Sequence, residues 1–267
     1  MLQVKNLRVN FLSRPDKWAV DDISFEIKEG DILGLVGESG SGKSVTAMAI
    51  SGLLVKSQVK YSGSVTLQGR EMLDAPRDSI RDMQGTDLAV VFQSPMSTLD
   101  PVMPIGRQVE EALRIHNNGN NGPILSAEEM KARAIQAMKD AELPDAESLY
   151  KKYPHQLSGG MLQRVCIAAA IISKPKLLIC DEPTTALDVT IQEQILALLK
   201  NINQQQKVSI LFISHNLAVV RALCNKVVVM QKGKIVEQGD AGDIYENPQH
   251  PYTQKLIASI PGRDKRL

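Results

Sequence analysis

The chain has 267 residues, 43% of them hydrophobic, and its 31 basic and 30 acidic side chains leave a formal net charge of +1. This length can bury a substantial core, and the balanced charge gives no argument from composition for binding nucleic acid or an anionic membrane. No run approaches the roughly 18 apolar residues of a transmembrane helix and no signal-peptide core is visible, so we expect a soluble cytosolic chain.

The three cysteines, Cys166, Cys180 and Cys224, are dispersed and lie in apolar surroundings. This pattern is typical of reduced core residues in the cytosol. We therefore expect neither a cysteine-based metal site nor a cluster.

The first part of the chain has β-type patterns. Residues 2–11 and 18–27 predict an antiparallel β layer, because apolar and polar side chains alternate in the second of them. Residues 61–70 and 88–92 predict two further short strands.

A helical segment then interrupts the strands. Residues 94–106 contain three prolines and predict a turn-rich connection, and residues 107–152 follow with helical periodicity. Ser126 and Glu129 form a capping box, which predicts that a helix starts near Ser126. We interpret this part as an inserted helical subdomain.

The α/β pattern returns after this segment. Residues 177–182 form a nearly continuous apolar strand, residues 190–204 a helix and residues 208–213 another buried strand. Residues 226–230 and 234–237 predict a β-hairpin.

The stretch 37–44, GESGSGKS, fits the phosphate-loop pattern G-x-x-x-x-G-K-[ST] at every defined position. An apolar strand at 31–36 precedes it and a helix at 45–54 follows, so backbone N–H groups and the helix N-terminus can face a pyrophosphate. Lys43 would reach the β and γ phosphates, and Ser44 would ligate Mg²⁺. The alternative is a glycine-rich turn that only resembles this pattern.

Two carboxylates, Asp181 and Glu182, end the apolar strand at the sheet edge where α/β proteins bind ligands. Asp181 would hold Mg²⁺ through water, and Glu182 would act as general base toward the attacking water. A solvated turn is the alternative reading.

Ser158, Gly159 and Gly160 precede an apolar helical run at 165–172. At a helix start these small residues can offer N–H groups to an anion, which would be a second phosphate-binding device. A glycine-rich helix entry without a ligand is the alternative.

Together these segments resemble the ATP-binding cassette (ABC) ATPases over nearly the whole chain. The phosphate loop, Gln93, the LSGG signature at 157–160, the Asp181-Glu182 pair, the segment 185–188 and His215 occur in the family's order. The resemblance implies an α/β fold, a P-loop NTPase core with an antiparallel β subdomain and an inserted helical subdomain. Residues 1–93 and 166–267 would form the core, and residues 94–165 the helical subdomain.

The resemblance also implies a head-to-tail dimer in which ATP lies between the phosphate loop of one subunit and the signature of the other. Gln93 would sense Mg²⁺ and the attacking water, His215 would contact the γ-phosphate, and Asp188 would order the loop facing the partner site. Phe11 matches the adenine-stacking position better than Trp18, although core packing is an equal alternative for either ring.

The complete expected site is as follows. Catalytic residues are Lys43, Gln93, Glu182 and His215, metal ligands are Ser44, Gln93 and Asp181, and the residues that bind ATP are Phe11, Gly37, Ser39, Gly40, Ser41, Gly42, Lys43, Ser44, Thr46, Gln93, Ser158, Gly159, Gly160 and Asp188.

Segments 92–101, 157–164 and 239–253 are similar to the ATPase subunits of dipeptide, oligopeptide and nickel importers. Three residues depart from that pattern, namely Leu162, Asn216 and Cys180, and Met161 with Leu162 favours the nickel or metal-chelate branch. No cysteine follows Cys224, so we do not expect the cysteine-rich C-terminal region of many members.

The resemblance thus implies an ATPase at the cytoplasmic face of the membrane. Its partners would be a second, related ATPase subunit, two permease subunits and, indirectly, an extracytoplasmic binding protein, with no nucleic acid. One alternative is a soluble ABC ATPase that acts on ribosomes or DNA, but the chain lacks tandem cassettes, a long coiled-coil insertion and a basic extension. A non-hydrolysing regulator conflicts with the presence of Lys43, Glu182 and His215.

Overall fold

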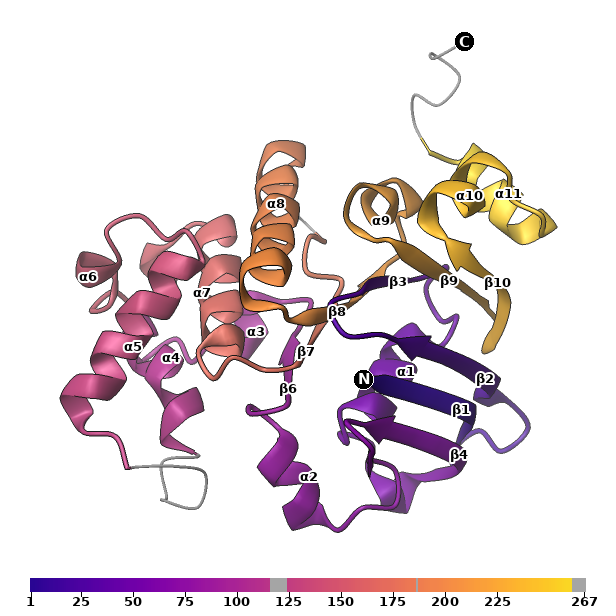
Figure 1. Ribbon diagram of the computed structural model, residues 1–267, viewed down its shortest axis with the longest axis horizontal. Helices are drawn as coiled ribbons and strands as arrows, with labels where there is room; N and C mark the ends of the chain where they lie inside the picture. The colour runs from indigo at the N-terminus through magenta and orange to yellow at the C-terminus, as the bar shows by residue number, and fades with distance from the viewer. Residues whose placement is uncertain (116–123, 186, 261–267) are drawn as a thin grey trace. The chain divides into compact units, whose positions relative to one another are not determined.

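A computed structural model describes residues 1–115, 124–185 and 187–260. The chain forms two compact units (Figure 1). The first combines Met1–Ile80 with Ser209–Leu267, and the second is Arg81–Val208.

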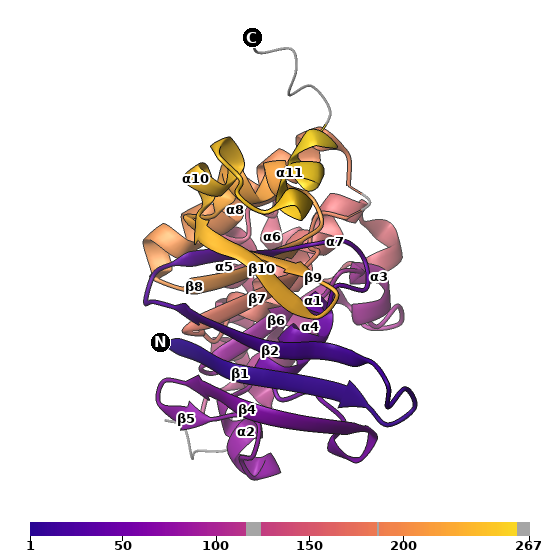
Figure 2. The ribbon, with the colours of Figure 1, turned by 90° about the vertical axis from the view of Figure 1, so that its right-hand side faces the viewer.

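An antiparallel sheet forms one part of the first unit. Its strands are β1 (Leu2–Phe11), β2 (Trp18–Ile27), β4 (Val59–Leu67) and β5 (Arg70–Glu71), in the order β2-β1-β4-β5 (Figure 2). Side chains along β1 and β2 alternate between buried and exposed, so one face of this sheet joins the core. The predicted antiparallel layer is confirmed.

The other sheet of this unit is built around β3 (Ile32–Val36), in which all five side chains are buried. It pairs in parallel with β8 (Ser209–Ser214) and β9 (Lys226–Gln231), and β10 (Lys234–Asp240) pairs antiparallel to β9. This order confirms both the buried strand before the phosphate loop and the predicted hairpin.

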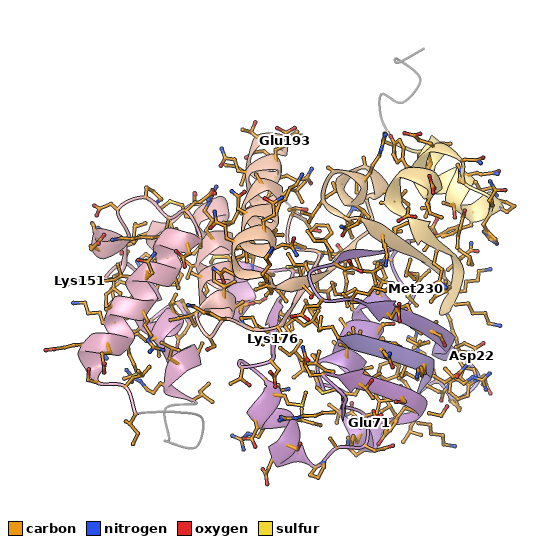
Figure 3. All side chains as sticks on the ribbon, viewed as in Figure 1. Asp22, Glu71, Lys151, Lys176, Glu193 and Met230 are labelled. Carbon is orange, nitrogen blue, oxygen red and sulfur yellow. The ribbon has the colours of Figure 1, made fainter. Side chains whose placement is uncertain are left out.

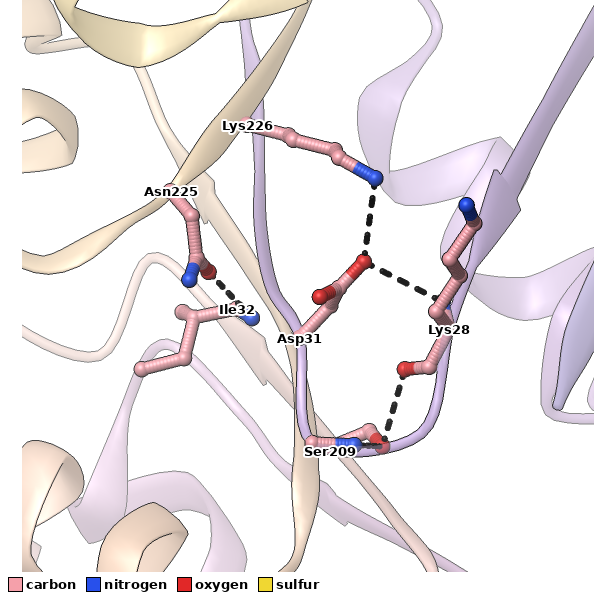
Figure 4. Close-up of polar contacts among 7 residues, drawn as sticks. Lys28, Asp31, Ile32, Ser209, Asn225 and Lys226 are labelled. Atoms are coloured by element: carbon pink, nitrogen blue, oxygen red, sulfur yellow. Dashed lines mark hydrogen bonds and ion pairs between the residues drawn. The ribbon is translucent and has the colours of Figure 1, made fainter.

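Polar contacts hold the start of β3 in place (Figure 4). Lys226 forms an ion pair with Asp31 at 3.2 Å, and the Asn225 side chain accepts a hydrogen bond from the N–H of Ile32 at 2.8 Å. The Ser209 hydroxyl bonds to two backbone groups of the preceding turn, at 2.9 and 3.3 Å. The start of β3 is therefore held by β8, by β9 and by the residue before β9.

Helices of the first unit pack around these sheets. Gly34 on β3 lies against the helix after β8, where an added Cβ would come within 2.2 Å of Val220, so this packing requires a glycine. The helices are α1 (Lys43–Ile50), η1 (Lys56–Gln58), α9 (Leu217–Leu223), α10 (Ala241–Glu246) and α11 (Pro251–Ala258), and α2 (Arg77–Met83) begins in this unit and ends in the second.

In the second unit, β6 (Leu88–Val91) pairs in parallel with β7 (Leu177–Asp181). Helices α4, α5 and α7 pack against one another (Figure 1). The helices of this unit are α3 (Pro95–Thr98), α4 (Ile105–Arg114), α5 (Ala127–Asp140), α6 (Ala146–Leu149), η2 (Pro154–Gln156), α7 (Gly159–Ile171) and α8 (Val189–Gln206).

Three details in this unit bear on the predictions. The capping box is confirmed, because the Ser126 hydroxyl accepts from the N–H of Glu129 at 3.2 Å and the Glu129 carboxylate accepts from the N–H of Ser126 at 2.8 Å. The segment predicted as turn-rich contains a short helix, α3, which Pro95 starts. Helix α7 runs without a break across residues 165 and 166, where the sequence places a subdomain boundary, and that division stays a prediction.

The cysteines are buried and form no disulfide among the described residues. Burial raises the pKa of Cys166 to about 12, and burial with the neighbouring Asp181 charge raises the pKa of Cys180. Within residues 1–115, 124–185 and 187–260, no helix has the length and hydropathy needed to cross a bilayer.

Candidate active site

The phosphate loop leaves β3 and enters α1 through a glycine-rich turn. An added Cβ at Gly37 would lie 2.2 Å from the carbonyl oxygen of Met230, which Figure 3 labels, and one at Gly42 would lie 2.6 Å from that of Ala19. Gly42 also has a φ of 108°, a left-handed value that favours glycine. The backbone geometry therefore requires glycine at both positions.

Lys43 lies beneath this loop and is only 5% exposed. Its ammonium donates hydrogen bonds to the carbonyl oxygens of Gly37 at 2.7 Å and Glu38 at 3.0 Å. The loop thus curls around one positive charge.

Ser41 supplies a test of whether the loop suits a ligand. Its hydroxyl is buried, with the residue 4% exposed, and has no hydrogen-bond partner among the described residues. Leaving a buried hydroxyl unpaired costs about 1–3 kcal/mol, and a phosphate oxygen could accept a hydrogen bond from it. The loop therefore fits a bound phosphate.

The hydroxyls that follow differ in their surroundings. Ser39 and Ser44 are exposed, whereas Thr46 is fully buried and its hydroxyl donates to the carbonyl of Gly42 at 3.0 Å. The Thr46 hydroxyl is thus engaged within its own helix, and its part in nucleotide binding stays a prediction.

In the second unit, Glu182 and Gln93 come together although 89 residues separate them. The Gln93 side-chain amide donates to Oε2 of Glu182 at 3.2 Å, and the Thr185 hydroxyl donates to the same oxygen at 2.9 Å. Glu182 has a φ of 49°, a left-handed conformation that is uncommon outside glycine and that occurs often at functional sites. The sequence did not predict the contact from Thr185 to Glu182, although it identified the segment 185–188 as a family motif.

The predicted metal ligands are all oxygen donors, which is the donor type that Mg²⁺ prefers. Asp181 ends β7, and Ser44 lies in the first turn of α1. The amide nitrogen of Gln93 donates to Glu182, so the amide oxygen of Gln93 is not used in that hydrogen bond. The donor chemistry fits Mg²⁺.

His215 is exposed and follows β8 in the first unit. The next residue, Asn216, caps α9, because its side-chain oxygen accepts from the N–H of Ala218 at 3.0 Å. An aspartate can cap a helix in the same way, so this departure from the family pattern leaves the local backbone well capped.

The signature residues begin α7. The Ser158 hydroxyl accepts from the N–H of Met161 at 3.4 Å. An added Cβ at Gly160 would lie 2.7 Å from the Ile191 side chain on α8, whereas one at Gly159 would lie 3.8 Å from Leu187. Packing against α8 therefore requires Gly160 to be small, a reason that the sequence did not reveal.

Asp188 caps α8, since its carboxylate accepts from the N–H of Ile191 at 2.9 Å. It thus orders the start of the helix that follows the 185–188 segment.

The two candidate adenine platforms lie on neighbouring strands. Phe11 ends β1 and is half-buried, and Trp18 starts β2 with 39% exposure. The Arg8 guanidinium lies 6.0 Å from the centre of the Trp18 ring, so a cation already interacts with that ring. The choice of Phe11 stays a prediction.

One contact at the phosphate loop was missed entirely. The hydroxyl of Tyr252, on α11, accepts a hydrogen bond from the N–H of Glu38 at 2.9 Å. The only available signal was the tail motif at 239–253, which indicates a subfamily and no contact.

Two family models match parts of the chain. Residues 20–185 match the family described as "ABC transporter", and residues 236–267 match the family "Oligopeptide/dipeptide transporter, C-terminal region".

Two relatives align over nearly the full chain. The dipeptide transport ATP-binding protein DppD of Lactococcus lactis subsp. cremoris is 45% identical over 100% of this chain and 75% of its own length. The oligopeptide transport ATP-binding protein OppD of Escherichia coli is 43% identical over 99% of this chain and 77% of its own length.

Two solved structures share the fold. The ATP-binding cassette MJ0796, a dimer bound to ADP and Pi in that structure, has a TM-score of 0.78 at 28% identity and covers 90% of this chain and 99% of its own. CbiO1 from Clostridium perfringens has a TM-score of 0.77 at 26% identity and covers 97% and 95%. The predicted fold class, a mixed α/β cassette with an antiparallel β part and a parallel core sheet, is confirmed.

Proposed function

We propose that this chain, which belongs to the ABC transporter family as one of the ATP-binding subunits of its oligopeptide and dipeptide importers, hydrolyses ATP to power peptide import. The observation that best supports the catalytic part is the hydrogen bond from Gln93 to Glu182. It joins the residue predicted to sense Mg²⁺ and water to the residue predicted to act as general base.

The phosphate loop binds the nucleotide. When ATP binds, the ammonium of Lys43 moves from the loop carbonyls to the β and γ phosphates. The phosphates are stronger hydrogen-bond acceptors than the carbonyls because they carry full negative charge. The buried Ser41 hydroxyl then gains a partner. The N-terminus of α1 and the backbone N–H groups of residues 39–44 face the same phosphates, apart from the N–H of Ser41, which donates to the carbonyl of Glu38 at 3.2 Å.

Glu182 activates the attacking water. Hydrogen bonds from Gln93 and Thr185 orient its carboxylate, and proton abstraction by an oriented general base contributes about 10²- to 10⁴-fold to the rate. His215 contacts the γ-phosphate, and Gln93 links the state of the site to the segment that follows it.

Ser44, Gln93 and Asp181 would hold Mg²⁺, which neutralises phosphate charge when it is bound. The side chains contribute a hydroxyl, an amide oxygen and a carboxylate.

The signature segment completes the site of a second subunit. Ser158, Gly159 and Gly160 contribute N–H groups at the start of α7, and Asp188 orders the neighbouring loop. The partner is a related ATPase subunit, and the pair binds two permease subunits at the cytoplasmic face of the membrane. An extracytoplasmic binding protein is an indirect partner and delivers the substrate to the permease.

Peptides are the proposed cargo. Both relatives reported above are named for dipeptide or oligopeptide transport, and the C-terminal match is to the same group. The same match disfavours a soluble ABC ATPase of ribosomes or DNA, and the inclination toward nickel from Met161 and Leu162 finds no support in these relatives.

Replacing Glu182 with Gln tests the catalytic assignment. Turnover should fall about 10²- to 10⁴-fold because the base is lost, while ATP binding persists. Phosphate release and equilibrium ATP binding are measured on the assembled transporter.

Two variants calibrate this experiment. Glu193→Gln makes the same chemical change at an exposed position on α8 and should leave turnover unaltered (Figure 3). Lys43→Ala should weaken ATP binding itself. Substantial residual hydrolysis in the Glu182 variant would remove Glu182 as the base.

A further inference from the structure

Residues from the C-terminal part of the chain contact the phosphate loop at several points. The backbone of β9 meets the loop at Gly37, and the N–H of Gly233, in the turn before β10, donates to the carbonyl of Ser41 at 2.9 Å. Tyr252 adds the contact at the beginning of the loop, from 214 residues further along the chain. Residues of the family's C-terminal region thus reach the nucleotide site.

Tyr252 and Lys43 hold the two ends of one peptide group. The carbonyl of Gly37 accepts from Lys43 at 2.7 Å, and the N–H of Glu38, in the same peptide, donates to Tyr252 at 2.9 Å. A peptide group is planar, so two opposed hydrogen bonds set its orientation. This peptide is the first of the phosphate loop, and it sets the direction in which the loop leaves β3.

The tyrosine is suited to a permanent contact. It is 6% exposed, and burial raises the pKa of its hydroxyl above the usual 10.0, so the group stays neutral at physiological pH. A neutral hydroxyl oxygen accepts a hydrogen bond from the backbone and keeps its own proton.

Other contacts hold the tyrosine itself in position. Glu237 on β10 accepts from the N–H groups of Gln249 at 2.8 Å and His250 at 3.1 Å, just before α11. The Nδ1 of His250 then accepts from the N–H of Tyr252 at 3.1 Å and caps the helix. Helix α11 is therefore anchored to β10 immediately before Tyr252.

We propose that Tyr252 is a positioning residue for ATP binding, whose hydroxyl keeps the Gly37–Glu38 peptide oriented when Lys43 leaves it for the phosphates. This rests on the proposed function, in which Lys43 transfers to ATP. Without the hydroxyl, the peptide would keep neither of these two hydrogen bonds once Lys43 moves to ATP, and part of the binding free energy would be lost to ordering the loop.

The test is Tyr252→Phe in the full-length chain, assembled with its transporter partners. Affinity for ATP, measured with a fluorescent ATP analogue and as KM, should fall about tenfold, since one partly buried hydrogen bond is lost. The kcat should stay within about twofold, because the group does not touch the reacting atoms.

A matched control is Tyr245→Phe. It removes the same hydroxyl from α10, where the ring packs on Arg221 at 4.3 Å and lies outside the contacts described above. The control should leave KM unchanged, and the two variants should unfold at similar temperatures. A general loss of stability would lower both the unfolding temperature and kcat in the Tyr252 variant.

A second variant tests the anchor. Glu237→Ala should weaken ATP binding in the same direction by a smaller factor, and in the double variant with Tyr252→Phe it should add nothing, because it acts through the tyrosine. An ATP affinity of the Tyr252 variant within twofold of wild type overturns the proposal, as does full additivity in the double variant. Wild-type protein that neither binds nor hydrolyses ATP would instead overturn the proposed function.

Discussion

Gly160 illustrates how one position can serve two requirements. Its backbone lies at the start of α7, where we propose that the N–H groups of the signature bind nucleotide, and its missing side chain makes room for Ile191 on α8. Gly159, one residue earlier, has no such neighbour. A nucleotide contact and a packing contact can therefore be separated by comparing the two glycines.

Gly160→Ala should destabilise the protein by about 1–3 kcal/mol, because the new methyl group would overlap Ile191 at 2.7 Å. Gly159→Ala, where the nearest described side chain is at 3.8 Å, should cost much less. Urea unfolding followed by circular dichroism compares the two. Equal losses would mean that the tight contact with α8 does not limit residue 160.

Glu182 adopts a left-handed backbone conformation that places a neighbouring hydroxyl at its carboxylate. Its left-handed backbone turns the chain sharply after β7, and this brings Thr185 back to its carboxylate. The sequence places a carboxylate at the strand end but contains no sign of this turn, because only the folded backbone shows the φ angle.

Helix α5 is the element whose start is most clearly encoded locally. Ser126 and Glu129 satisfy each other's backbone N–H groups, so this end of the helix needs no other partner. The short helices α3 and α6 were not predicted, since four residues are too few for a hydrophobic period to appear.

Ser126→Ala should destabilise the protein by about 1 kcal/mol, because the N–H of Glu129 loses its acceptor. Ser57→Ala serves as the control: Ser57 is also exposed and its hydroxyl caps no helix. Thermal unfolding of both variants measures the difference. A loss in the control as large as in the Ser126 variant would argue against a specific capping effect.

In the head-to-tail arrangement that we propose, each phosphate loop requires the signature segment of a second subunit opposite it. This arrangement predicts that ATP promotes pairing when hydrolysis is blocked. An isolated chain should bind ATP and hydrolyse it slowly.

Glu182→Gln with ATP should therefore form a dimer, detected as a doubled mass by light scattering after size exclusion. Lys43→Ala should remain monomeric, since it binds ATP poorly. If the natural pair is heteromeric, dimer appears only when the related subunit is added. A Glu182 variant that stays monomeric both alone and with that subunit would contradict the composite site.

Most of the secondary-structure elements and all of the motifs could be predicted from local sequence patterns. Strands β1, β2, β3, β7 and β8, the capped helix α5 and the phosphate loop could all be predicted, because hydrophobic periodicity, capping residues and glycine spacing act between near neighbours in the chain. The family could be identified for the same reason, since its motifs are short and ordered.

Contacts between residues far apart in the sequence became visible only in the folded chain. The contacts of Gln93 with Glu182, Gly160 with Ile191 and Tyr252 with Glu38 depend on strand pairing and on the packing of helices that lie far apart in sequence. A hydrogen bond of about 3 Å requires the backbone to be placed within a fraction of an ångström, and no local pattern specifies that placement.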